Sequence, residues 1–202
     1  PTFDGRTQSP TNLWHVSDLE AASSGHGITP AFDGSRLGNT GNVGFVNKVE
    51  PNNSIGTAQS LEGLVWSLDF NSDIGDLLTN TSTTIPHMTV SAVGDDSFDY
   101  YSFDVTTPGA RGIFDIDYGY GIDPLTDVDT MIFLFDATGN LVALDDDSFT
   151  GWGAGGSVHP FDSYLELSFA NPGTYVLGVG SFFSSVTAGG ISGTPIRNGG
   201  TY

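Results

Sequence analysis

The chain has 202 residues, and its 24 Asp and Glu against 5 Lys and Arg give a formal net charge of −19. So few basic residues cannot neutralise a nucleic-acid backbone, and an anionic membrane surface would repel the chain, so we expect neither partner. The sequence has no run of about 18 apolar residues, which excludes a membrane-spanning helix and membrane insertion. It also has no cysteine, which excludes disulfides and thiolate metal sites.

The first part of the chain, residues 1–47, is rich in Gly, Ser, Thr and Asn with isolated aromatic residues. We expect an irregular N-terminal segment with one or two edge strands, packed on or leading into a domain over residues 48–202. Strand-like residues begin near 61–68, and a short strand is expected over 88–93. Between them, residues 71–85 are polar and rich in Thr, which predicts a surface insertion.

The following strands are predicted from the spacing of apolar residues. Apolar and polar residues alternate over 101–105 and again over 114–118, which predicts strands with one solvent-facing side, including Asp115 and Asp117. The continuous apolar run 130–135 is typical of a central strand covered on both faces. A turn over 136–140 predicts a hairpin into 141–144.

Two more strands are expected near the end of the chain, over 165–169 and 174–179, with a turn between them. Short strands separated by Gly, Pro and Asp predict an all-β fold, an antiparallel β-sandwich of jelly-roll type.

The triplet Gly-Thr-Tyr occurs twice, at 173–175 and at the chain end, 200–202. The first copy opens a predicted strand, so by analogy Tyr202 begins a last strand that is truncated here. One interpretation is a simple chain boundary. The other is an open sheet edge that a further chain completes by strand addition.

The acidic residues are mostly Asp, 20 of 24, and 13 of these Asp lie between residues 95 and 147. They fall mainly into three loop clusters, which would repel one another at one end of a sandwich unless a cation lies among them. Ca²⁺ suits such a site because it takes 6–8 oxygen ligands in flexible geometry, whereas zinc is a poor fit without cysteine. The alternative is that these acidic loops are solvated and form turns.

Four segments resemble the bacterial pre-peptidase C-terminal domain family. The sequence EPNNS at 50–54 with Ala58 is similar to the opening of that domain, and DSFDYYSFDV at 96–105 is similar to its acidic and then Tyr-rich strand. The sequence DTMIFLFD at 129–136 with Gly139 resembles its central hairpin, and GTYVLGV at 173–179 resembles its penultimate strand. The resemblance covers roughly residues 48–202 and leaves out the 64–87 insertion.

This resemblance implies a secreted jelly-roll domain, attached to peptidases or present in cell-surface proteins. In collagen-binding relatives, calcium lies between the segment before the first strand and the acidic loop. Carried over to this chain, the implied ligands are Glu50, Asn52, Asn53, Asp96 and Asp99. The chain departs from those relatives at Lys48, where they can place another acid, and at Asn53, where Asp is usual. Both changes lower the local negative charge, so one calcium ion is implied there. We place a second site at Asp127 or at Asp145, Asp146 and Asp147.

No catalytic motif is present, and the four histidines lie in sequence contexts without an obvious paired acid. We therefore expect a non-catalytic, calcium-stabilised extracellular accessory or surface-structural module. A second hypothesis is a module that binds an extracellular polysaccharide or protein through exposed aromatic residues, among them Tyr120 and Trp152. A third is a subunit of a surface filament or layer, in which copies of the chain associate by strand addition.

Overall fold

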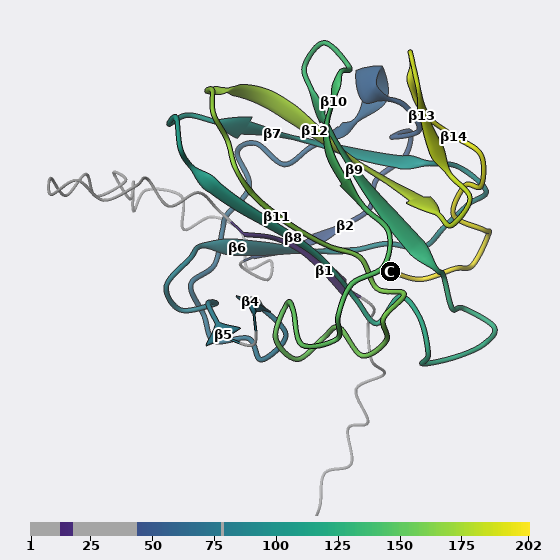
Figure 1. Ribbon diagram of the computed structural model, residues 1–202, viewed down its shortest axis with the longest axis horizontal. Coiled ribbons are helices and arrows are strands. Elements are labelled where there is room, and N and C mark those ends of the chain that lie inside the picture. Colours follow the sequence, from purple (N-terminus) through teal and green to yellow (C-terminus); the bar gives the residue numbers. More distant parts are fainter. Residues whose placement is uncertain (1–12, 18–43, 78) are drawn as a thin grey trace, which may run out of the picture.

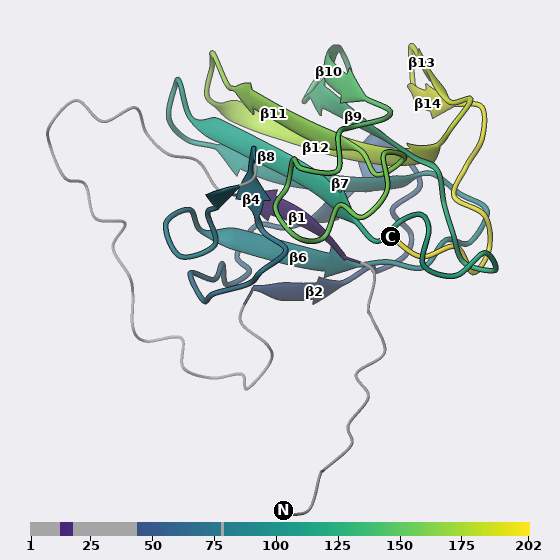
Figure 2. The ribbon, with the colours of Figure 1, turned by 60° about the horizontal axis from the view of Figure 1, so that its bottom comes forward.

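The computed structural model describes residues 13–17, 44–77 and 79–202, and for 13–17 only the backbone. Two five-stranded sheets pack face to face, with two small hairpins at the periphery (Figures 1 and 2). This arrangement confirms the predicted all-β sandwich. No helix in these residues is long and apolar enough to cross a membrane.

The first sheet has the order β11-β8-β1-β6-β2, and its neighbours are antiparallel except that β2 runs parallel to β6. Its strands are β1 (Leu13–Ser17), β2 (Phe45–Asn47), β6 (His87–Ser91), β8 (Arg111–Asp117) and β11 (Tyr164–Ser168).

The second sheet has the order β10-β9-β12-β7-β3, again antiparallel except for β3 beside β7. Its strands are β3 (Gln59–Ser60), β7 (Asp99–Val105), β9 (Thr130–Asp136), β10 (Leu141–Asp145) and β12 (Gly173–Ser181). The remaining elements are the hairpins β4 (Gly75–Asp76) with β5 (Thr79–Asn80) and β13 (Ser185–Thr187) with β14 (Gly190–Ser192), and the short 3₁₀ helix η1 (Ile55–Thr57).

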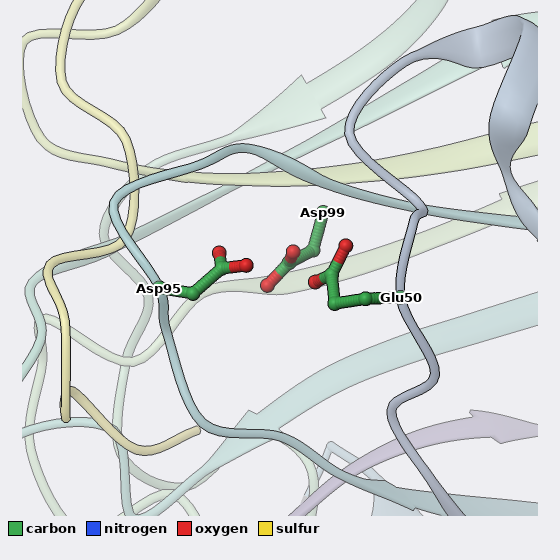
Figure 3. A group of neighbouring side chains, drawn as sticks. All are labelled: Glu50, Asp95 and Asp99. Atoms are coloured by element: carbon green, nitrogen blue, oxygen red, sulfur yellow. The ribbon is translucent and has the colours of Figure 1, made fainter.

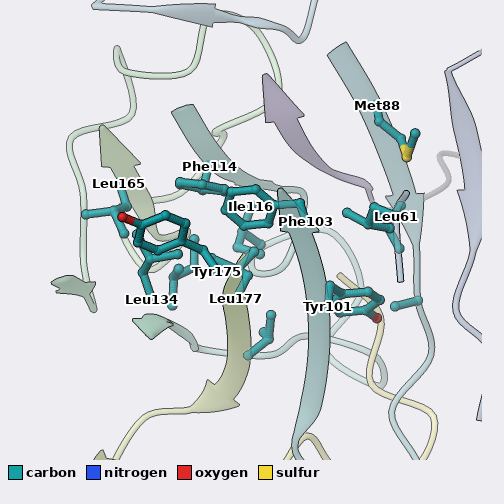
Figure 4. Packing of buried hydrophobic residues seen from close by; sticks show 14 of the residues in the cluster. Leu61, Met88, Tyr101, Phe103, Phe114, Ile116, Leu134, Leu165, Tyr175 and Leu177 are labelled. Carbon is teal, nitrogen blue, oxygen red and sulfur yellow. The ribbon is translucent and has the colours of Figure 1, made fainter. Parts of the chain in front are cut away.

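The main core lies between the two sheets and is built from the inward-facing residues of both (Figure 4). Phe103 of β7 meets Phe114 of β8 across the sandwich, with ring centroids 5.4 Å apart. Burying such rings removes a large apolar area from water and supplies much of the free energy that holds the sheets together.

Strand β9 is buried on both faces, as its continuous apolar run predicts. Ile132 and Leu134 point into the main core. Met131, Phe133 and Phe135 form a second cluster on the outer face, which is covered by residues of η1 and of the β13–β14 hairpin. The hairpin from β9 into β10 also forms, and Asp136 accepts hydrogen bonds from the backbone N–H groups of its turn.

The N-terminal segment contributes more to the fold than its sequence predicts. Strand β2 is an edge strand, as expected, but β1 lies inside the first sheet, hydrogen-bonded to β6 on one side and to β8 on the other. Residues 1–12 and 18–43 lie outside the described residues. The strands expected over 61–68 are reduced to β3, just before this stretch, and an isolated bridge at Ser67.

The outer face of β8 is covered, which corrects the expectation that it meets solvent. Asp115 and Asp117 are only 2% and 0% exposed. A glycine-rich loop, residues 151–157, lies over them and approaches so closely that a Cβ on Gly156 would be 1.9 Å from the Asp117 carboxylate. The expected 64–87 insertion adds to this layer, because Ile74 and Ile85 within it are buried.

Because the loop needs this close approach, we predict that Gly156→Ala lowers the free energy of unfolding by roughly 1–3 kcal/mol, as overpacking does. Gly189→Ala is the matched control, since a Cβ there meets nothing within 4 Å. Its effect should stay below about 1 kcal/mol. Urea denaturation of both variants measures the difference, and equal losses would show that the loop does not pack on β8.

Candidate metal centres

The structure gathers acidic side chains into two groups of three carboxylates. Within the described residues, the first group is Glu50, Asp95 and Asp99, and the second is Asp129, Asp146 and Asp147. In each group one oxygen from every carboxylate lies within 4.8 Å of the others. At such distances the negative charges repel strongly, so each group favours a bound cation.

The first group joins two parts of the chain that are distant in the sequence, Glu50 and the segment 95–99 (Figure 3). Glu50 lies between β2 and η1, Asp95 lies in the loop before β7, and Asp99 is the first residue of β7. Asp99 is fully buried, whereas the carboxylates of Glu50 and Asp95 are partly exposed. Their carboxylates point toward one another in Figure 3.

The ammonium group of Lys48 lies among these three carboxylates. Its Nζ atom is 2.7 Å from Glu50, 2.8 Å from Asp99 and 3.3 Å from Asp95. The Lys48 side chain is only 6% exposed. Burial alone would lower the pKa of Lys48, but the hydrogen bonds to Asp99 and Glu50 outweigh it and raise the pKa. Lys48 is therefore a fixed cation of the protein itself at this point.

The neighbouring polar groups also donate to these carboxylates. With its nitrogen turned toward them, the Asn52 amide donates to Glu50 at 2.9 Å and to Asp99 at 3.1 Å. The Tyr202 hydroxyl donates to the other oxygen of Asp99. Donors that surround a carboxylate satisfy the oxygens that a metal would use. The residues at this first group therefore do not fit a calcium ion.

The ligand set implied by the family resemblance is only partly brought together here. Glu50 and Asp99 converge, but Asn52 acts as a donor and Asn53 accepts the backbone N–H of Asn52 at 3.1 Å. Asp96 turns away in a left-handed conformation, with φ of 69°, and accepts the N–H of Asn198 at 2.9 Å. Asp95 is not among the predicted ligands, but it joins Glu50 and Asp99 in the group in place of Asp96.

The second group lies where β9 begins and β10 ends. Asp129 precedes β9, and Asp146 and Asp147 follow β10, so the pairing of these strands brings the carboxylates together. The Oδ1 atoms of Asp129 and Asp146 are buried and have no hydrogen-bond partner among the described residues. Burial, together with the charges of Asp147 and Asp146, raises the pKa of Asp129 to about 6. Burial and Asp147 raise the pKa of Asp146 in the same way.

Two of the predicted second-site residues have other roles. Asp127 accepts the backbone N–H groups of Ile122 and Asp123 at 3.2 and 3.0 Å, and so shapes the loop before β9. Asp145 accepts the Ser148 hydroxyl at 2.8 Å and the Tyr164 N–H at 2.9 Å. The sequence does not distinguish Asp129 from Asp127, because both lie in the same acidic loop segment.

The two aromatic candidates lie against other rings. Tyr120 packs on His159 and Phe161, with ring centroids 4.6 and 4.9 Å away. Trp152 packs on Tyr164 at 5.7 Å and is partly exposed. A surface pocket of about 370 Å³ lies beside Ser67, Phe70 and His87, and neither Tyr120 nor Trp152 lines it.

No protein-family model matches the sequence, and no curated protein matches it either. The resemblance to the pre-peptidase C-terminal domain therefore stays a prediction that rests on the four motifs.

We predict that Lys48→Met lowers the free energy of unfolding by about 3 kcal/mol, because it leaves buried negative charge without its cation. Arg197→Met is the control, since Arg197 is exposed and donates to the backbone carbonyl of Asp127. Adding Asp99→Asn to Lys48→Met should recover part of the loss. Chemical denaturation in the presence of a chelator measures all three variants, and a Lys48→Met effect no larger than that of Arg197→Met would contradict this role.

A second prediction concerns pH. Burial raises the pKa of Asp162 to about 7, although the N–H groups of His159 and Tyr120 hydrogen-bond to it, and that of Asp129 is about 6. In the unfolded chain both have a pKa of about 4, so the folded state binds more protons in between, and stability falls as pH rises from about 4 to about 7. In chelator, the melting temperature should be higher at pH 5 than at pH 8. Asp162→Asn should reduce this difference, and an unchanged slope would show that Asp162 does not contribute.

Proposed function

We propose that this chain is a non-catalytic, calcium-stabilised extracellular module of the pre-peptidase C-terminal type, with an accessory or surface-structural role. The fold supports this proposal. The motifs that carry the resemblance supply β7, the β9–β10 hairpin and β12, which are neighbours in one sheet of the sandwich. The opening motif precedes η1, which packs beside that same sheet.

The calcium ion in this proposal binds at Asp129, Asp146 and Asp147. The observation that carries it is the pair of buried carboxylate oxygens, one on Asp129 and one on Asp146, that have no partner among the described residues. A buried carboxylate without a partner is costly, and a cation among the three removes this cost. Three carboxylates supply only oxygen ligands, which favours Ca²⁺ over zinc.

The ion would hold together the ends of two adjacent strands, since the ligands come from the loops that begin β9 and end β10. Its role is therefore structural. Extracellular modules bind calcium with dissociation constants of about 10⁻⁴–10⁻³ M. A site built from three carboxylates in an acidic, cysteine-free chain suits a secreted or cell-surface location, where calcium is abundant.

We predict that Ca²⁺ raises the melting temperature of the protein and that a chelator reverses the rise. At a calcium concentration 100 times the dissociation constant, linkage stabilises the folded state by about 2.7 kcal/mol. For a domain of this size the shift is roughly 5–10 °C. Mg²⁺ should act more weakly, because it requires near-ideal octahedral geometry and loses its water reluctantly.

Site variants test where the ion binds. Asp146→Asn and Asp129→Asn should each abolish most of the calcium-dependent shift, whereas Asp69→Asn, an exposed acid outside both groups, should leave it unchanged. Differential scanning fluorimetry at constant ionic strength separates binding from charge screening. If the melting curve of the unaltered protein does not move at about 10–100 mM Ca²⁺, roughly 100 times the expected dissociation constant, the calcium part of the proposal is wrong.

A further inference from the structure

The last residues of the chain run along the end of β6. Thr201 forms an antiparallel bridge with Val93. Ala92 and Tyr202 exchange backbone hydrogen bonds, with N–H to oxygen distances of 3.2 and 3.4 Å. Tyr202 is fully buried. The last two residues therefore pair antiparallel with Ala92 and Val93, which extend β6.

Strand β1 lies on the same side of β6 as Tyr202. The backbone groups of Thr89 and Ser91 point to β2, because Thr89 donates to Gly44 at 2.7 Å and Ser91 accepts from Lys48 at 2.9 Å. Backbone groups alternate in direction along a strand, so those of Val90 and Ala92 point the other way, toward β1. Tyr202 bonds to Ala92 on that side.

The register shows that β1 continues the line of the C-terminal residues without a gap. Tyr202 lies opposite Ala92, and Trp14 lies opposite Val90. Leu13 is therefore opposite the one intervening residue of β6. Both segments are antiparallel to β6, so they run in the same direction, and the C-terminus lies beside the start of β1 in Figures 1 and 2.

Two distant parts of the sequence thus form one strand line, and β1 fills the position directly beyond Tyr202. This slot, the space between β6 and β8, is inside the first sheet. Leaving it empty would expose unpaired backbone groups of both neighbours, so a strand must occupy it. In the structure the chain's own β1 occupies this slot, hydrogen-bonded to β6 and β8.

We propose that β1 is an exchangeable strand, which fills the slot in its own molecule or in a neighbouring copy of the chain. The sequence between Ser17 and Gly44 has 26 residues. Fully extended, such a segment spans roughly 90 Å, several times the thickness of a sandwich. The same backbone hydrogen bonds and register form in either arrangement, so the two differ mainly in loop-closure entropy, which changes slowly with length.

Exchange of this kind links copies in two ways. Reciprocal exchange between two copies closes a dimer, whereas donation from each copy to the next produces an open chain. Insertion within one molecule is favoured in dilute solution, because the link gives an effective concentration in the millimolar range. The exchanged form therefore increases when the protein folds at high concentration. This inference does not depend on the calcium proposal.

Cysteine cross-linking tests the proposal, since the chain has no cysteine of its own. His15 of β1 lies opposite Thr89 of β6. Thr89 directs its backbone N–H to β2, so this is a non-hydrogen-bonded pair with Cα atoms about 4.5 Å apart, within the range of a disulfide. Chains carrying His15→Cys are refolded together with chains carrying Thr89→Cys, at about 0.5 mM, near the effective concentration of the linked strand, and then oxidised.

The expected product is a covalent heterodimer, seen by intact-mass spectrometry and non-reducing electrophoresis. It should decrease at least tenfold when the mixture is refolded at a hundredfold lower concentration. The control pairs His15→Cys with Thr138→Cys, which lies in the exposed β9–β10 turn and should give no specific dimer. Size-exclusion chromatography with light scattering should show dimers or longer chains of the unaltered protein after concentrated refolding.

A double variant with both cysteines in one chain tests whether β1 occupies the slot at all. If this variant forms its internal disulfide but the mixed chains form no heterodimer at high concentration, β1 stays in its own molecule and the proposal is overturned. If the double variant forms no disulfide between these positions in any chain, β1 does not occupy the slot, and the proposal is overturned as well.

Discussion

Buried negative charge needs a nearby cation, and the Lys48 ammonium meets this need where the two sheets join. Lys48 follows β2 of the first sheet, and Asp99 begins β7 of the second. Because Asp99 is fully buried, its charge is compensated only by the groups that the protein places around it. The ion pair therefore holds the edge of one sheet to the start of the other and orders the loop that contains Asp95.

The two acidic groups consist of the same kind of side chain but have different surroundings. In the first group, hydrogen-bond donors and a lysine surround the carboxylates. In the second, the Oδ1 atoms of Asp129 and Asp146 are buried without donors among the described residues. The difference lies in the neighbours, not in the acids. An acidic cluster therefore indicates a metal site only where the protein supplies no cation or hydrogen-bond donor of its own to the carboxylates.

Some of the fold could be predicted from the sequence because its cause is local. The run over β9 is apolar at every position, so both faces must be covered, and they are. The alternation over β8 predicts a strand but not what covers its polar side. Asp115 and Asp117 are buried because Gly153 and Gly156, which have no side chains, allow a loop to approach them. A glycine-rich segment is a signal of close approach, but its partner is a distant strand.

The candidate site was predictable to the same extent. The aspartate clusters lie in loops, and Lys48 departs from the pattern of the family that the sequence resembles. That its ammonium group lies among Glu50, Asp95 and Asp99 depends on contacts between segments up to about 50 residues apart. The position of β1 could not be predicted for the same reason. A strand of five residues carries too little pattern to select its neighbours, and β-pairing over such distances is set by the whole sheet.

The lysine-centred ion pair and the strand line of β1 are connected through Tyr202. Its hydroxyl donates to Asp99, and its backbone pairs with Ala92 at the position next to β1. Asp99 therefore holds Tyr202, the residue next to which the slot begins, and the Lys48 ammonium lies 2.8 Å from Asp99 as its counter-charge. Tyr202 is buried, and both its hydroxyl and its backbone are hydrogen-bonded. The position where the slot starts is therefore fixed by the sandwich, whichever molecule supplies β1. One end of the slot is thus positioned by the same ion pair that joins the two sheets.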